Sequence, residues 1–291
     1  MIAALLTTAF GAQVLRIAIP YVLAALGGTI TERAGVVDLA IEAKLLFGAF
    51  AAAAVAHATH SPWLGVLGGA GAGAFVAATQ VWLALGFGAN QIIVGVGLNL
   101  LALGGTRFLL QLTYGEGANS PQIAGFSSAL VGNPIAWFAL LAAIGVPLAL
   151  GWTRWGLRLR AAGDRPSALV AVGVDPTGVR LGAAVVGGAL AGVGGAQLAL
   201  SVNGFSAGMS GGRGYIALAM VILSGWRPAW AVVACVGVAV AEAGNILLQV
   251  SGDAVPRELA PLLPYALTLA VLVVAGGRRE PPRALGKQET T

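Results

Sequence analysis

Charged residues are scarce in this sequence. Asp, Glu, Lys and Arg make up 9% of its 291 residues, whereas a soluble globular domain contains about 25%. The mean hydropathy is +0.87, and 58% of the residues are apolar. Because so few charges cannot cover the surface of a soluble protein of this size, the composition excludes that class and predicts an integral membrane protein.

Residues that commonly carry chemistry are scarce as well. Cys235 is the only cysteine, so no disulfide can form within the chain. The two histidines, His57 and His60, lack a nearby cysteine or carboxylate and make a poor zinc site. No G-x-x-x-x-G-K-[ST], G-x-S-x-G or H-E-x-x-H motif is present. We therefore expect no enzyme activity, no catalytic residue, no metal and no bound cofactor.

Long apolar runs dominate what is present. A membrane-spanning helix needs about 20 mostly apolar residues, and helices satisfy their own backbone hydrogen bonds in lipid. The sequence therefore predicts an all-α polytopic membrane protein with about nine transmembrane helices, within a range of eight to ten. The candidate spans are residues 9–28, 36–57, 62–84, 91–113, 134–153, 181–202, 213–225, 229–250 and 259–275.

The basic residues indicate the orientation. Basic loops stay on the cytoplasmic side of a membrane protein, and the central loop, residues 154–180, holds five arginines against two aspartates. The tail, residues 276–291, is also basic. We expect one permease domain over residues 1–275 and a cytoplasmic C-terminal tail, with the N-terminus outside if the span number is odd. This placement of the basic residues does not indicate a nucleic-acid partner.

The central loop has helix-capping signals. Asp164 is predicted to cap a short helix that has Pro166 in its first turn and Gly173 just past its end. Asp175 followed by Pro176 predicts the start of another helix. A short helix between two spans suits docking to a partner. The pattern alone fits equally well an ordinary basic loop held near anionic lipid.

Small residues recur at a spacing of four in two of the spans. Close approach of helix backbones in lipid depends on such residues, so both ridges predict tight helix packing. One ridge consists of Gly65, Gly69, Gly73 and Ala77, and the other of Ala184, Gly188, Gly192 and Ala196.

Several polar residues fall inside the predicted spans, where they are costly and point to function. Asp38 and Glu42 lie four apart and should share a helix face, with Arg33 or Lys44 as a partner. They form either an ion-pair cluster that fixes helix geometry or part of a translocation path.

Further polar residues follow helical spacing. Asn99, Thr106 and Thr113 recur every seven residues after Asn90 and Gln91, and Glu242, Asn245 and Gln249 form a second stripe. Both sets fit hydrogen bonding between helices or contact with a polar solute. Gln197, Asn203 and Ser206 could line an outer mouth. The residues expected along the path are Asn90, Asn99, Glu242, Asn245, Asp38 and Glu42.

Five blocks of the sequence resemble a known family. They cover residues 23–50, 90–104, 156–180, 212–228 and 263–287, and include the strings ERAG and ALGK. The chain resembles the bacterial nucleoside-type ABC importer permeases, a branch of the simple-sugar and branched-chain amino-acid permease family. More narrowly, it looks like the shorter of two paired permeases. The resemblance extends from Ala18 to Lys287.

The resemblance implies a multi-pass subunit of the bacterial cell membrane that forms the path for a small polar solute, a nucleoside or a simple sugar. It implies a second homologous permease, a cytoplasmic ATPase that hydrolyses ATP, and an extracytoplasmic substrate-binding lipoprotein as partners. It also implies an ATPase-coupling segment, made of Gly163, Asp164, Arg165, Pro166, Ser167, Ala168 and Gly173.

The sequence departs from the family at three neighbouring positions. Members of the family that it resembles usually carry an uncharged residue, often Asn, at the position of Asp38, Gly at Ala43 and an apolar residue, often Met, at Lys44, so this chain adds one charge of each sign. The alternative hypothesis is a stand-alone secondary transporter, in which Asp38, Glu42 and Glu242 would bind a coupling ion.

Overall fold

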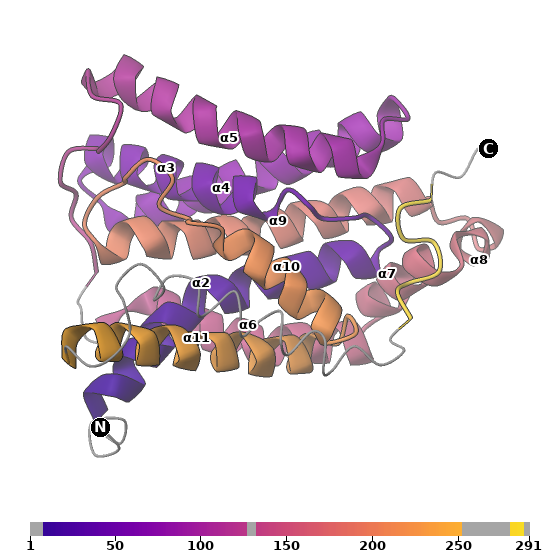
Figure 1. Ribbon diagram of the computed structural model, residues 1–291. Coiled ribbons are helices and arrows are strands. Elements are labelled where there is room, and N and C mark those ends of the chain that lie inside the picture. The colour runs from indigo at the N-terminus through magenta and orange to yellow at the C-terminus, as the bar shows by residue number, and fades with distance from the viewer. Residues whose placement is uncertain (1–7, 127–131, 252–279, 288–291) are drawn as a thin grey trace.

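The computed structural model describes residues 8–126, 132–251 and 280–287, and helices make up almost all of these ranges. Most helices run roughly along one axis, and the short helices α7 and α8 lie at one end, which we name the α7–α8 end (Figure 1). The helices are α2 (Thr8–Arg33), α3 (Ile41–Thr59), α4 (Pro62–Val81), the π-helical turn η1 (Trp82–Gly86), α5 (Gln91–Tyr114), α6 (Pro134–Trp152), α7 (Arg154–Asp164), α8 (Pro166–Ala171), α9 (Pro176–Ser201), α10 (Arg213–Leu223) and α11 (Pro228–Ser251).

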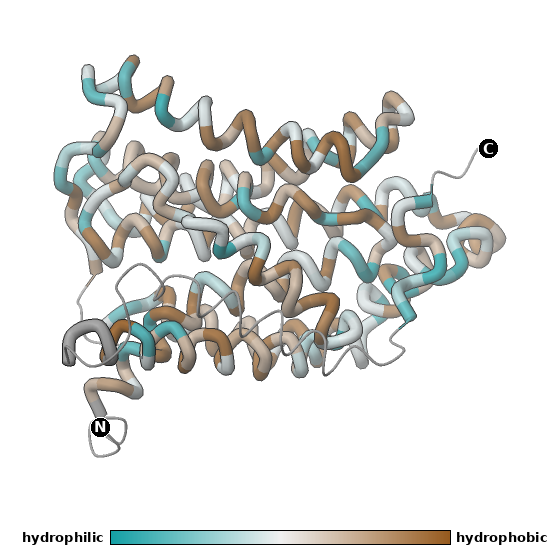
Figure 2. Tube along the Cα trace, in the orientation of Figure 1, coloured by the Kyte–Doolittle hydropathy of each residue, from teal (hydrophilic) through white to brown (hydrophobic). Residues whose placement is uncertain are grey.

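The predicted fold class is confirmed. Within the described ranges, seven helices are long and apolar enough to cross a membrane. Together with the shorter apolar helix α10, they account for eight of the nine predicted spans. The ninth predicted span, residues 259–275, lies outside the described residues. The side of the N-terminus depends on the number of spans and therefore stays a prediction. Hydrophilic residues gather towards the two ends of the bundle, notably at the α7–α8 end (Figure 2).

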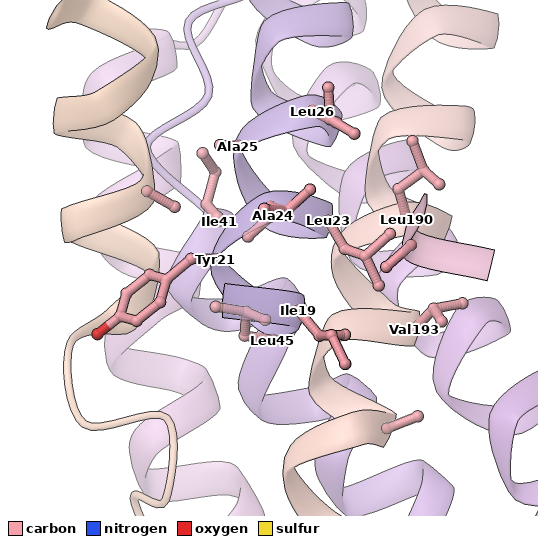
Figure 3. Close-up of a cluster of buried hydrophobic side chains, with 14 of the residues drawn as sticks. Ile19, Tyr21, Leu23, Ala24, Ala25, Leu26, Ile41, Leu45, Leu190 and Val193 are labelled. Atoms are coloured by element: carbon pink, nitrogen blue, oxygen red, sulfur yellow. The ribbon is translucent and has the colours of Figure 1, made fainter. Parts of the chain in front are cut away.

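Helix α2 lies at the centre of the bundle and packs against both α3 and α9. Leu23 and Leu26 of α2 are fully buried. In the buried cluster they lie among Ile41 and Leu45 of α3 and Leu190 of α9 (Figure 3). The 26 residues of α2 extend over about 39 Å at 1.5 Å per residue, which exceeds the bilayer core thickness of about 30 Å.

The two glycine ridges face each other, as the sequence predicts. A Cβ atom added at Gly73 would overlap the carbonyl oxygen of Gly188, and one added at Gly192 would overlap the carbonyl oxygen of Gly69. Helix α3 joins the same contact, because a Cβ at Gly48 would lie 2.7 Å from the Cα of Gly192. Helices α3, α4 and α9 are therefore held together by direct backbone contacts.

Two connections are not helical although they run inside the bundle. Residues 34–40 lead from α2 to α3, and residues 202–212 lead from α9 to α10, so that α3 and α10 both begin inside the bundle (Figure 1). Helix α10, with 11 residues, is about 16 Å long and too short to span a bilayer. The predicted span 36–57 therefore begins five residues too early, because its first residues belong to a loop.

A bulky residue in the shared ridge should prevent this packing. We expect Gly192→Leu to destabilise the protein by about 3 kcal/mol or more, because a side chain there meets the backbone of α4. Gly182→Leu on the same helix is the control, since no atom lies within 4 Å of the Cβ position of Gly182. The yield of monodisperse protein and its thermal unfolding in detergent measure the effect. Equal stability of the two variants would contradict the ridge.

Candidate functional site

The loop of residues 34–40 is the point at which polar side chains from several helices converge. Its backbone is buried or half-buried. The amides of residues 34–36 bond to carbonyl groups in the last turn of α2, and the groups beyond them need side-chain partners. Gln91 of α5 accepts a hydrogen bond from Val37 N at 2.8 Å, and Gln80 of α4 donates to Val37 O at 2.9 Å. Asn99 of α5 donates to Leu39 O at 2.8 Å.

The start of the same loop is held from the α7–α8 end. The guanidinium of Arg180 on α9 donates to Ala34 O at 3.3 Å and to Ala162 O of α7 at 3.2 Å. Arg33, the last residue of α2, donates to Trp226 O at 2.9 Å. The loop is thus tied to α7, to α9 and to the turn that precedes α11.

Asp38 and Lys44 form an ion pair that is almost fully buried, with exposed fractions of 1% and 0%. Glu32 lies beside it, where one carboxylate oxygen accepts from Asp38 N at 3.1 Å and the other from the indole of Trp226. The pairing of the two extra charges is therefore internal to the chain. Burying two charges costs desolvation energy that their attraction offsets, whereas removing one partner leaves the other charge buried and unpaired, which is strongly destabilising.

The predicted placement of Asp38 and Glu42 on one helix face is wrong. Asp38 lies in the loop, three residues before α3 begins, whereas Glu42 lies in the first turn of α3. The two carboxylates consequently have separate partners. One contacts Lys44, and the other turns towards α10.

Glu42 caps the start of α10 from outside that helix. Its carboxylate accepts from the hydroxyl of Ser210 at 2.6 Å, from Gly212 N at 2.9 Å and from Gly214 N at 2.7 Å. Free N–H groups and a partial positive charge collect at a helix N-terminus. The negative charge of Glu42 is therefore compensated by α10, inside the bundle, where α3 and α10 begin.

Glu242 of α11 is also paired. It accepts from the phenol of Tyr21 at 2.8 Å and from the guanidinium of Arg213 at 2.8 Å. The side chains of Arg213 and Glu242 are 26% and 16% exposed. Asn245, three residues further on, is buried on the same helix. For Gln249, the third residue of the predicted stripe, side-chain placement lies outside the described part of the structure.

Asn99 links three elements. Its Oδ1 accepts from Ala43 N at 2.9 Å, and its Nδ2 donates to Tyr215 Oη at 3.1 Å in addition to Leu39 O. Tyr215 is 50% exposed. Thr106 is buried on the same face of α5, whereas Thr113 is exposed near its end.

Asn90 has a different position from the other residues predicted to line the path. It is exposed and caps α5, accepting from Ile92 N at 2.9 Å and Ile93 N at 3.3 Å. The structure thus brings Asn99, Asp38 and Glu42 together around residues 34–42, with Glu242 and Asn245 on the neighbouring α11. Their role in translocation stays a prediction.

Gln197 and Asn203 lie at the end of the bundle opposite α7 and α8. They line a polar cavity of about 260 Å³ together with Arg16 and Asn133. Ser206 pairs instead with Asn119 in an isolated β-bridge.

The central loop folds into two helices that meet at a sharp bend. The prediction of a short helix is confirmed by α8, with Pro166 in its first turn and Gly173 past its end at φ +74°. The prediction that Asp164 caps it is wrong, because Asp164 is the last residue of α7 and Arg165 occupies the N-cap position. Asp175 caps α9 as predicted, accepting from Thr177 N at 2.9 Å and Gly178 N at 2.7 Å.

The two faces of α8 differ. Pro166 and Leu169 are buried against the bundle, whereas Ser167, Ala168 and Val170 are exposed. Val170 and Val172 are 62% and 72% exposed. The last turn of α7 is packed tightly, since a Cβ at Gly163 would overlap the carbonyl oxygen of Arg33. The segment therefore offers a small apolar surface outward and is fixed inward to the end of α2.

Two important side chains were missed by reasoning from the sequence. Gln80 of α4 and Tyr21 of α2 are buried and hydrogen-bonded to distant elements. Gln80 could have been identified from its residue type, because an amide side chain inside an apolar span needs a hydrogen-bond partner. Tyr21 gives no such signal, since tyrosine is common in membrane helices.

Comparison with known proteins identifies a matching family. Residues 11–272 match the family described as the permease component of branched-chain amino acid transport systems. The guanosine ABC transporter permease protein NupQ of Bacillus subtilis is 30% identical to the chain over 295 residues, covering 92% of both proteins. No solved structure matches the chain.

Two further relatives carry different substrate names. The nucleoside ABC transporter permease protein NupC of Lactococcus lactis is 30% identical over 294 residues, again covering 92% of both proteins. The putative glucose ABC transporter permease protein TsgC13 of Haloferax volcanii is 33% identical over 271 residues, covering 86% of this chain and 80% of the relative.

Breaking the buried ion pair should be more harmful than removing it. We expect Lys44→Met to destabilise the protein by about 3–5 kcal/mol, because it leaves Asp38 as an unpaired buried carboxylate. The double variant Asp38→Asn with Lys44→Met should recover most of this loss. Thermal unfolding of the two variants and the unchanged protein in one detergent measures the coupling. A double variant as unstable as the single one would contradict the pairing.

Proposed function

The chain belongs to the family of permease components of ATP-binding-cassette transport systems, and from this premise we propose that it forms part of the path for an uncharged, hydroxyl-bearing solute of the nucleoside or simple-sugar class. The relatives support this class, because their names refer to guanosine, nucleosides and glucose. The chain is a multi-pass membrane protein and its relatives are transport subunits, so ATP hydrolysis is assigned to a partner ATPase.

The main support for this proposal is that the ionised side chains near the starts of α3 and α10 have compensating partners within the chain. Asp38 is paired with Lys44, and Glu242 with Arg213. Glu42 is held by the N-terminus of α10. These three sites leave no charged side chain over to pair with a zwitterionic amino acid or an ion. A hydroxyl-rich solute needs only hydrogen-bonding groups such as the half-exposed phenol of Tyr215.

The same observation argues against the alternative of an ion-coupled secondary transporter. In that alternative, the coupling ion would bind a carboxylate inside the bundle. Asp38, Glu42 and Glu242, the three residues considered for that role, are all engaged by cations or by backbone N–H groups.

We assign the docking of the ATPase to the exposed face of α8. Val170 and Val172 are exposed at the end of the bundle where the arginines of the central loop gather. That charge supports a cytoplasmic position of the α7–α8 end and of residues 280–287 beside it. An extracytoplasmic binding lipoprotein would then meet the opposite end. A second, homologous permease would cover the half-exposed Tyr215 and Arg213, and the chain would reside in the bacterial cell membrane.

The first test targets the proposed docking face. We expect Val170→Asp to reduce recovery of the ATPase at least about tenfold, because a buried unpaired charge in an interface costs more than about 2 kcal/mol. Pull-down from native membranes in mild detergent, with partners identified by mass, measures it. Val202→Asp is the control, because Val202 is 63% exposed at the opposite end. Equal ATPase recovery with both variants would overturn the assignment.

The second test targets charge compensation beside the path. We expect Glu242→Gln to slow uptake of radiolabelled guanosine about tenfold, because the unpaired Arg213 guanidinium raises the barrier by about 1–2 kcal/mol. The double variant Glu242→Gln with Arg213→Gln should regain most of the rate at equal amounts of chain in the membrane. Unlabelled glucose and leucine serve as competitors. Uptake of radiolabelled leucine by the unchanged chain, with no uptake of guanosine or glucose, would overturn the proposed solute class.

A further inference from the structure

The C-terminal segment of residues 282–287 lies against both the coupling helices and the polar loop. The amide of Ala284 donates to Gly163 O of α7 at 2.8 Å, and the amide of Gly286 donates to Gly35 O of the loop at 3.2 Å. The amide of Arg283 also approaches the carboxylate of Asp164 at 3.4 Å. One short segment thus bridges the end of α7 and the start of the loop of residues 34–40.

The segment has a defined conformation for this bridge. Leu285 N donates to Pro282 O at 3.0 Å and Lys287 N donates to Ala284 O at 3.1 Å, which forms two successive turns. Gly286 has φ +72°, in the left-handed region that glycine adopts at low cost. The side chains of Pro282 and Ala284 are buried, while Arg283 and Lys287 are exposed. The apolar side therefore faces the bundle and the basic side faces outward.

The segment also closes a cavity beside the loop. Val37, Gln91 and Gly286 line a space of about 290 Å³, together with Gly88 and other residues at the start of α5. Gln91, which holds Val37 N, has no second hydrogen-bond partner for its Nε2 among the described residues. A displacement of the segment would therefore change the surroundings of the backbone that leads to Asp38 and Glu42.

We propose that residues 282–287 act as a clasp that transmits movement of α7 and α8 to the loop of residues 34–40. This rests on the proposed docking of an ATPase to α8. Ala284 and Gly286 are the positioning residues, because their amides make the two hydrogen bonds of the bridge. The clasp adds to the link made by Arg180, which also bonds α7 and the loop. Because the loop carries Asp38 and leads into Glu42, the clasp joins the coupling segment to the polar groups along the path.

The test follows a reporter in the loop rather than uptake alone. In the complete importer purified from native membranes, Val37→Cys is labelled with a maleimide, with and without ATP plus vanadate. Cys235 is fully buried and gives little background. With the clasp intact, we expect ATP plus vanadate to change the labelling rate severalfold. In a chain that ends after Pro281, this change should be lost while ATP hydrolysis continues.

Two variants separate transmission from stability. Ala284→Pro removes the amide that donates to Gly163 O and fixes φ at that position, and Ala284→Gly keeps that amide and is the matched control. A chain that ends after Lys287 keeps the clasp and should respond as the full chain does. If ATP plus vanadate still changes the labelling rate in the Ala284→Pro variant and in the chain that ends after Pro281, the clasp is overturned. If no ATPase is recovered with the unchanged chain, the proposed function fails instead.

Discussion

The structure depends on the need to satisfy the backbone of a non-helical segment inside an apolar bundle. No water in the bilayer core is available to an unpaired N–H or C=O group, and each such group costs several kcal/mol. Residues 34–40 meet this constraint with side chains and amides from elsewhere, including Gln80, Gln91, Asn99 and Arg180. Helices α4, α5 and α9 must therefore be in place before α2 and α3 can be joined in this way.

The arrangement of charges follows from the same scarcity of water. Ionised groups in the interior must be paired, and the chain uses three kinds of partner. Lys44 serves Asp38, Arg213 serves Glu242, and the N-terminus of α10 serves Glu42. Because the compensation is internal, the cost of burying each charge is offset during folding of the chain itself. In the proposed function, a solute that passed beside these groups would encounter dipoles and hydroxyls rather than net charge.

Local signals in the sequence predicted much of the fold. The Asp175-Pro176 start, the short helix before Gly173 and the two small-residue ridges depend on neighbours within one or two turns, and the structure confirms all of them. The errors concern helix boundaries that distant residues determine. Gly35, with φ +96°, marks the end of α2. The sequence near Asp38 does not show where α3 begins, because partners of that loop such as Gln80 and Arg180 lie more than 40 positions away. Likewise Asp164 looks like a cap, but packing of Gly163 against Arg33 extends α7 through it.

The contacts divide the molecule into a rigid part and a part that can rearrange. Helices α2, α3, α4 and α9 touch through glycine backbones, for instance Gly27 with Gly187 and Gly48 with Gly192. Sliding such helices by even a fraction of a turn would place carbonyl groups against Cβ atoms, so these four move as one body. Helices α10 and α11 pack on that body through buried apolar side chains such as Ile216 and Val238, and polar links such as the hydrogen bond from Tyr21 to Glu242 lie beside this packing. Because such a hydrogen bond can break and re-form, the proposed change of access would involve the polar groups of Glu42, Arg213 and Glu242.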